Sequence, residues 1–170
     1  MQSIDFADVE RALAKIHHVP EDRRLAFKAR LGNLKRLGAV PSSGGRGRKL
    51  TYSIEDAYLL AFAVELGQFG VDPAWIKLII EGKKERIIEA FRRVGTHYIE
   101  YLAKLAPEFL AASPDKSYAL GALELVFFLP GQDDPKAESL TKWIGSRAAI
   151  INIGSLKQEI DAALMPKVDD

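Results

Sequence analysis

Apolar residues recur at helical spacing through the first two thirds of this chain and gather in short, mainly apolar runs in its last third. Near the N-terminus they form one helical stripe, made of Phe6, Val9, Leu13 and Ile16. Ser3 or Asp5 is suited to cap this first helix, which we predict to end near His17. The pattern indicates a helix with one buried face.

A second helix is predicted between Pro20, which suits a first helical turn, and Gly38, which favours a helix end. Four leucines can face the core along it, namely Leu25, Leu31, Leu34 and Leu37. The cations and the asparagine of this helix are then left for its other faces.

Two further helices follow from capping signals. Residues 53–56 (Ser-Ile-Glu-Asp) fit a capping box with Asp in place of Glu, and the helix behind them is apolar over much of its circumference. This third helix should therefore lie in the middle of its domain and end at Gly67 and Gly70. Asp72 as cap and Pro73 at the first helical position then start a fourth helix.

From residue 87 the apolar positions alternate in steps of four and three, as they do in the contact seam of paired helices. The seam contains Ile87, Phe91, Val94, Tyr98, Tyr101 and Leu105. Lys84 interrupts it one step earlier, and a long core helix would give the same pattern. The seam is therefore either a pairing surface or one side of a core helix.

The last third of the chain reads as a small α/β unit. Two apolar runs at residues 120–129 and 148–153 are typical of buried strands. A helix is predicted between them, from Asp134 towards Trp143, and a capping box at residues 155–158 opens a last helix. The order strand, helix, strand, helix predicts a parallel strand pair.

Composition places the chain among soluble globular proteins, with 48% hydrophobic and 28% charged residues in a length of 170. No apolar run approaches the roughly 20 residues that span a bilayer. The acidic N-terminal segment does not resemble a signal or a transit peptide. Because the chain has no cysteine, it has no disulfides or thiolate metal sites, and we expect a cytoplasmic protein.

Positive charge is concentrated in one segment. The chain has a net charge of +1, but residues 20–50 hold nine Lys or Arg against two Asp or Glu, a local excess of +7. Within that segment the Gly/Ser loop at residues 41–49 cannot pack a core, and we predict it to be a hairpin tip before a β-prone stretch at residues 50–52. A flexible basic loop braced on an apolar helix is suited to lay charge along a phosphate backbone.

The most distinctive motifs are LGAVP at residues 37–41, GRGRKLTYS at residues 45–53 and FGVDPAWIKLI at residues 69–79. In order and spacing they resemble the MerR superfamily of winged-helix transcription regulators over roughly residues 4–105. The resemblance implies a winged helix-turn-helix over residues 1–82 and a DNA-binding dimer joined through a linking helix at residues 83–106. For this reason we favour the pairing interpretation of the apolar seam.

The recognition helix departs from the family, because the family's usual Arg falls at Gly32 and its first Tyr at Asn33. We therefore predict DNA contacts from residue type: Arg and Asn bind base edges bidentately, and Arg23, Arg30 and Asn33 can share one face. The other cations are expected on phosphates, and Tyr52 either joins them or braces the wing. The predicted DNA-binding residues are Arg23, Lys28, Arg30, Asn33, Lys35, Arg36, Arg46, Arg48, Lys49 and Tyr52.

No constellation of residues indicates catalysis. The chain lacks a nucleophile elbow, a Walker loop and a dinucleotide fingerprint, and carboxylate pairs such as Glu55 and Asp56 fall at helix starts, where they act as caps. His17 and His18 end the first helix, where cations interact favourably with the helix dipole, so we interpret them as structural rather than as metal ligands. We expect no enzyme, no metal and no cofactor.

The sequence thus predicts an α+β, mainly helical chain with an N-terminal winged helix-turn-helix, a linking helix and a small C-terminal α/β unit over residues 118–165. We expect a sequence-specific transcriptional regulator that binds an inverted repeat in double-stranded DNA as a homodimer, with no membrane association. Two alternatives remain open. One is an excisionase-like architectural DNA binder, and the other is a module whose C-terminal unit senses a small molecule or docks a protein.

Overall fold

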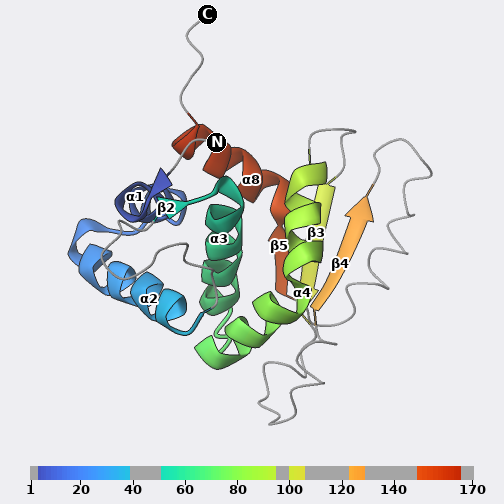
Figure 1. Ribbon diagram of the computed structural model, residues 1–170, viewed down its shortest axis with the longest axis horizontal. Coiled ribbons are helices and arrows are strands. Elements are labelled where there is room, and N and C mark those ends of the chain that lie inside the picture. Colours follow the sequence, from blue (N-terminus) through green and yellow to red (C-terminus); the bar gives the residue numbers. More distant parts are fainter. Residues whose placement is uncertain (1–3, 39–50, 95–99, 106–122, 129–148, 166–170) are drawn as a thin grey trace, which may run out of the picture.

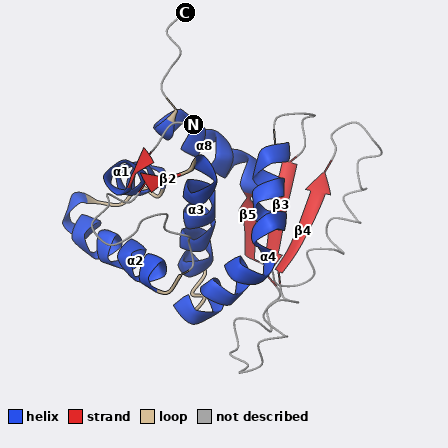
Figure 2. Cartoon of the chain, viewed as in Figure 1, coloured by secondary structure: helices blue, strands red, loops and turns tan. Residues whose placement is uncertain are grey.

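The protein is built mainly from helices, with two small antiparallel sheets (Figures 1 and 2). The computed structural model describes residues 4–38, 51–94, 100–105, 123–128 and 149–165. The elements in order are β1 (Ile4–Asp5), α1 (Phe6–Ile16), the 3₁₀ turn η1 (Glu21–Arg23), α2 (Arg24–Arg36), β2 (Thr51–Tyr52), α3 (Ile54–Gln68), α4 (Pro73–Arg93), β3 (Glu100–Leu105), β4 (Leu123–Phe128), β5 (Ala149–Asn152) and α8 (Ile153–Leu164). The predicted mainly helical α+β class is confirmed.

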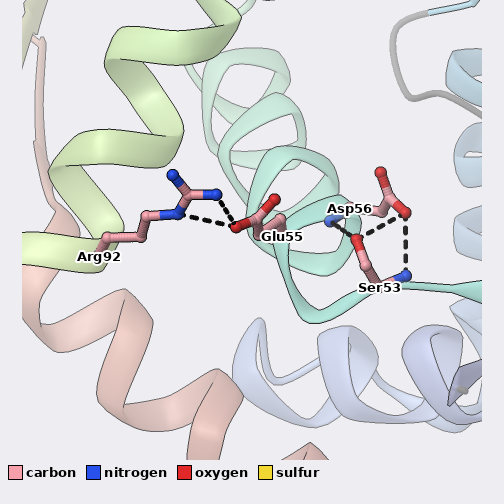
Figure 3. Close-up of polar contacts among 4 residues, drawn as sticks. All are labelled: Ser53, Glu55, Asp56 and Arg92. Carbon is pink, nitrogen blue, oxygen red and sulfur yellow. Dashed lines mark hydrogen bonds and ion pairs between the residues drawn. The ribbon is translucent and has the colours of Figure 1, made fainter. Parts of the chain in front are cut away.

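The starts of α1, α3 and α4 follow the predicted capping residues, whereas α8 begins at Ile153 with Asn152 as its cap, so the capping box predicted at residues 155–158 is wrong. At α1 the carboxylate of Asp5 accepts a hydrogen bond of 2.9 Å from the backbone N–H of Asp8. At α3 the predicted capping box is confirmed, with the Asp56 N–H donating to Ser53 Oγ at 3.1 Å and the Ser53 N–H donating to Asp56 Oδ2 at 2.9 Å (Figure 3). Asp72 caps α4 in a similar way. These side chains satisfy amide groups that a helix leaves without partners at its first turn.

Two short strands, β1 and β2, pair with each other and bring the start of α1 close to the start of α3. β1 immediately precedes α1 and β2 immediately precedes α3, and they pair antiparallel with Ile4 opposite Tyr52 and Asp5 opposite Thr51. Between α2 and β2 the chain passes through residues 39–50, so the predicted hairpin tip lies outside the described residues. The pairing fixes the position at which the chain returns to the described part of the structure, at Thr51.

α2 buries a different face from the one predicted. Phe27, Leu31 and Leu34 are buried, whereas Leu25 is 81% exposed, so its assignment to the core is wrong. Leu25 lies two residues before Phe27, which places it about 200° around the helix from that ring. Because the phenylalanine fits the same helical stripe as Leu31 and Leu34, the leucine is turned to solvent.

α4 ends at Arg93, so the predicted linking helix over residues 83–106 does not form. The backbone of Val94 has already left the helical region, with ψ 127°. Gly95, which follows in the sequence, is a poor helix former. Tyr101 and Leu105, assigned to the same helix, lie in strand β3, and Tyr98 lies outside the described residues.

The first three residues of the predicted pairing seam belong to the protein's own core. Ile87 and Phe91 are fully buried and Val94 is 8% exposed. The Phe91 ring stacks on that of Tyr58 in α3 with 4.7 Å between ring centroids. Arg92 adds an ion pair to Glu55 across the same helix pair, with its Nε 2.8 Å from Glu55 Oε1 (Figure 3). These apolar side chains are thus already covered by α3 and α8 and cannot form a surface for a second copy.

The larger sheet has the strand order β4–β3–β5. The predicted strands at residues 120–129 and 148–153 are confirmed as β4 and β5. The predicted parallel pair is wrong, because β3 lies between them and pairs antiparallel with both, Leu102 standing opposite Val126 on one side and Asn152 on the other. The predicted helix at residues 134–143 lies outside the part of the chain that is described.

α8 joins the C-terminal part of the chain to the N-terminal helices. It packs against α1, α3 and α4, and its Ile153, Leu156 and Ile160 belong to the same hydrophobic core as Leu13 and Phe62. Between α3 and α8 the Tyr58 hydroxyl also donates a hydrogen bond to Asp161. The N-terminal helices therefore share one continuous core with β5 and α8, contrary to the boundaries predicted at residues 82 and 118.

Candidate nucleic-acid interface

α2 is a helix with positive charge and no negative charge. It carries five cations and no carboxylate in 13 residues, the cations being Arg24, Lys28, Arg30, Lys35 and Arg36. Its apolar stripe faces α1 and α3, so the charged side chains are distributed over the remaining circumference. Which of them are available to a partner depends on what each one contacts.

Two of the five cations are held against α1. Arg24 Nε lies 3.5 Å from Glu10 Oε1, and this pair is largely shielded from solvent. The Lys35 ammonium lies over the Phe6 ring, 5.2 Å from its centroid, in cation–π geometry. The structure thus places Lys35, predicted to contact DNA, at the contact between the two helices.

Arg30 lies on the opposite flank of α2, folded towards α3. Its guanidinium occupies the space above Gly67, where an added Cβ would come within 2.1 Å of Arg30 Nη2. Together with Arg23 it lines a surface hollow of about 310 Å³, which His17, Phe27 and Gln68 also line. Two of the three residues predicted to contact bases therefore line the same hollow, but this hollow does not lie on the side of α2 opposite its buried stripe.

Asn33, the third member of that trio, is half-buried and already engaged. Its Oδ1 accepts a hydrogen bond of 2.9 Å from Arg36 Nη2. Arg36 and Lys28 are both exposed, and no carboxylate in the described residues forms an ion pair with either of them. Arg30 is also exposed and forms no ion pair with the described residues, but it is folded towards α3, so Lys28 and Arg36 are the two unpaired cations on the outward side of α2.

The outward ridge of α2 lies opposite its buried stripe. It consists of Leu25, Ala29, Gly32 and Arg36, with Lys28 on one flank and Asn33 on the other. The ridge is open to solvent, since a Cβ built at Gly32 would have no atom within 4 Å. Sequence reasoning missed this ridge because it assigned Leu25 to the core; the spacing of Phe27, Leu31 and Leu34 is the signal that identifies it.

Tyr52 is buried and does not reach the surface. The residue is 2% exposed, and its ring packs against Phe6 with 5.9 Å between centroids. Burial raises the pKa of its phenol. The predicted DNA contact of Tyr52 is therefore wrong. Tyr52 is a packing residue, and the wing that it was alternatively predicted to brace lies outside the described residues.

His17 is buried where α1, α2 and α3 meet. Its side chain is 4% exposed, with Nδ1 3.3 Å from Glu65 Oε1 and 2.9 Å from the side-chain nitrogen of Gln68. Burial first, and then the charges of Arg30 and His18, lower the pKa of His17 from 6.5 to about 4. The imidazole is therefore neutral at pH 7 despite the nearby carboxylate.

The remaining predicted contacts, Arg46, Arg48 and Lys49, lie outside the described residues. No protein-family model, curated protein or solved structure matches this chain. The helices in the described ranges include none that is both long enough and apolar enough to span a membrane. The MerR resemblance thus stays a prediction from its three sequence segments.

Proposed function

We propose that this chain is a sequence-specific DNA-binding regulator of transcription whose α2 enters the major groove. The observation that carries the proposal is the outward side of α2, which presents Lys28 and Arg36 without a counter-charge on a helix that has no carboxylate. A helix of 13 residues is about 20 Å long, and the major groove admits an α-helix along such a length. DNA would supply the negative charge that no carboxylate of the described residues places beside these two cations.

The surrounding framework supports this docking. α2 is held from behind by its buried stripe and from one flank by the Arg24–Glu10 pair, so its outward ridge is presented by a rigid support. The MerR resemblance implies a helix-turn-helix, a wing and a following helix pair, and the order of α1 and α2, β2, then α3 and α4 agrees with it. In this arrangement the wing cations Arg46, Arg48 and Lys49 are expected to bind flanking phosphates, which position a complex without reading sequence.

The proposal includes a two-fold dimer on an inverted repeat, because a short helix reads only one half-site. The pairing surface is not the seam that contains Ile87 and Phe91, since both are buried within the chain. Light scattering of the full chain measures the oligomeric state directly, and a mass of two chains is expected.

Removal of one cation from α2 tests the proposal. Lys28→Ala should weaken binding to a labelled duplex and reduce the salt dependence of binding by about one unit of slope, because one phosphate contact is lost. Arg86→Ala is the matched control: it removes one exposed cation from α4, away from α2. Equal losses in the two variants, or none in either, would contradict the assignment of α2 as the DNA-binding helix.

A further inference from the structure

Leu25 is the most exposed large hydrophobic residue in the described part of the chain. It is 81% exposed, and the next such residue, Met165 near the end of the described chain, is 48% exposed. A single exposed leucine is common on protein surfaces. Leu25, however, lies on the outward ridge of α2. Among the described helices, α2 is the only one that has cations and no acidic residue.

The place of Leu25 within α2 matters as much as its exposure. It is the second residue of the helix, followed one turn later by Lys28 and Ala29 on the same side. In helix-turn-helix proteins the N-terminal residues of the recognition helix contact base edges. The cation at Lys28 is then placed to bind a phosphate beside the groove, so the apolar side chain and the charge are complementary to neighbouring parts of one duplex.

We infer that Leu25 is a specificity-determining residue that packs against the 5-methyl group of thymine in the major groove. The inference rests on the proposed function. An aliphatic side chain makes no hydrogen bond, so it cannot read the donors and acceptors of base edges. The thymine methyl is the one apolar group among the base edges of the major groove, and apolar side chains contact it. Cytosine has only a hydrogen in place of this methyl group, and adenine and guanine present polar atoms, N7 with an amino group or a carbonyl oxygen, so none of the three offers Leu25 an equivalent apolar contact.

Replacement of thymine by deoxyuridine tests this contact because it removes only the methyl group. A binding site is first selected from random duplexes with the full chain, and each thymine in it is then replaced singly by deoxyuridine. At the thymine that Leu25 contacts, wild-type affinity should fall about fourfold, the factor that corresponds to burying one carbon group. Leu25→Ala should bind the thymine duplex more weakly and show no further loss with deoxyuridine there.

Lys28→Ala serves as the matched control on the same helix. It should weaken binding to both duplexes and keep the fourfold ratio between them, since it removes a phosphate contact and not the methyl contact. Leu25→Ala is expected to fold, because the leucine is 81% exposed, and its thermal melting curve verifies this.

The outcomes separate the inference from the proposed function. Tight, salt-dependent binding without loss at any deoxyuridine, or an equal loss in wild type and Leu25→Ala, would overturn the role of Leu25 and leave DNA binding intact. Failure of the chain to bind any duplex would overturn both.

Discussion

Gly32 occupies the middle of α2 although the helix itself has no need of a glycine there. A Cβ at this position would meet open space, and the residue does not have a positive φ. Glycine inside a helix is less stable than alanine by about 0.5–1 kcal/mol. No atom of the described residues lies close enough to Gly32 to require the absence of a side chain there. A duplex bound against the outward ridge would require it, because its backbone could then approach α2 more closely.

Gly32→Ala should therefore separate stability from binding. We expect the free energy of unfolding in urea to rise by about 0.5–1 kcal/mol, because alanine favours the helix. DNA affinity should fall, because the added methyl group stands on the ridge proposed to face the groove. Ala29→Gly is the complementary control, which should lower stability without adding bulk. A Gly32→Ala protein with unchanged affinity would show that DNA does not approach this part of α2.

His17 links stability to pH through one buried side chain. Its pKa is about 4 in the folded chain and 6.5 as an ordinary value, so between these limits the unfolded state binds more protons. The stabilisation that depends on neutral His17 is complete above about pH 6.5 and is lost as the pH falls towards 4. Glu65 has the opposite effect on the pH dependence of stability, because burial first and then the charge of Glu159 raise its pKa.

His17→Gln should flatten the decline in unfolding free energy between pH 6.5 and pH 5, as measured by urea denaturation at each pH. His18→Asn is the control, since His18 is exposed and has a φ of 49°, which asparagine adopts readily. The same pH dependence in wild type and His17→Gln would show that the buried histidine does not cause it.

At the scale of elements, local signals predicted local structure. The capping residues Ser53 and Asp72 identified their helix starts because a cap acts within one turn. The role of α4 and its end at Arg93 could not be predicted in this way, because apolar residues recur with the same spacing in a core helix and in a paired helix. Strand β3 was missed because its partners, β4 and β5, are about 20 and 50 residues away in the sequence. In the candidate site, the sequence predicted the cationic helix. It did not predict which side of that helix faces solvent, because this required knowing that Phe27 and not Leu25 is buried.

α4 provides the clearest test at this scale. Phe91→Ala should destabilise the fold by about 3–5 kcal/mol, because it empties a fully buried site stacked on Tyr58. Arg86→Ala on the same helix is exposed and should change stability by less than about 0.5 kcal/mol. Urea denaturation measures both. A Phe91→Ala protein of unchanged stability but halved mass in light scattering would restore the seam as a dimer interface.

At the scale of the whole molecule, the proposed DNA-binding part is not a separable domain. α8, more than 100 residues from α1 in the sequence, closes the core behind α1 and α3 (Figure 1). Removing residues after 82 would expose Leu13 and its neighbours to water. Residues 20–50 hold an excess of +7 in a chain of net charge +1, and α2, which carries five of these cations, packs against α1 and α3, which α8 contacts from the C-terminal part of the chain. Binding experiments therefore require the full chain.

The salt dependence of duplex binding tests the central claim most directly. Binding of the full chain to a labelled duplex is measured by fluorescence anisotropy across a series of salt concentrations. If a dimer contacts four to six phosphates, the logarithm of the association constant should fall against the logarithm of salt concentration with a slope of about −4 to −5. A slope near zero, or no binding at low salt, would contradict the proposal that this chain acts on DNA.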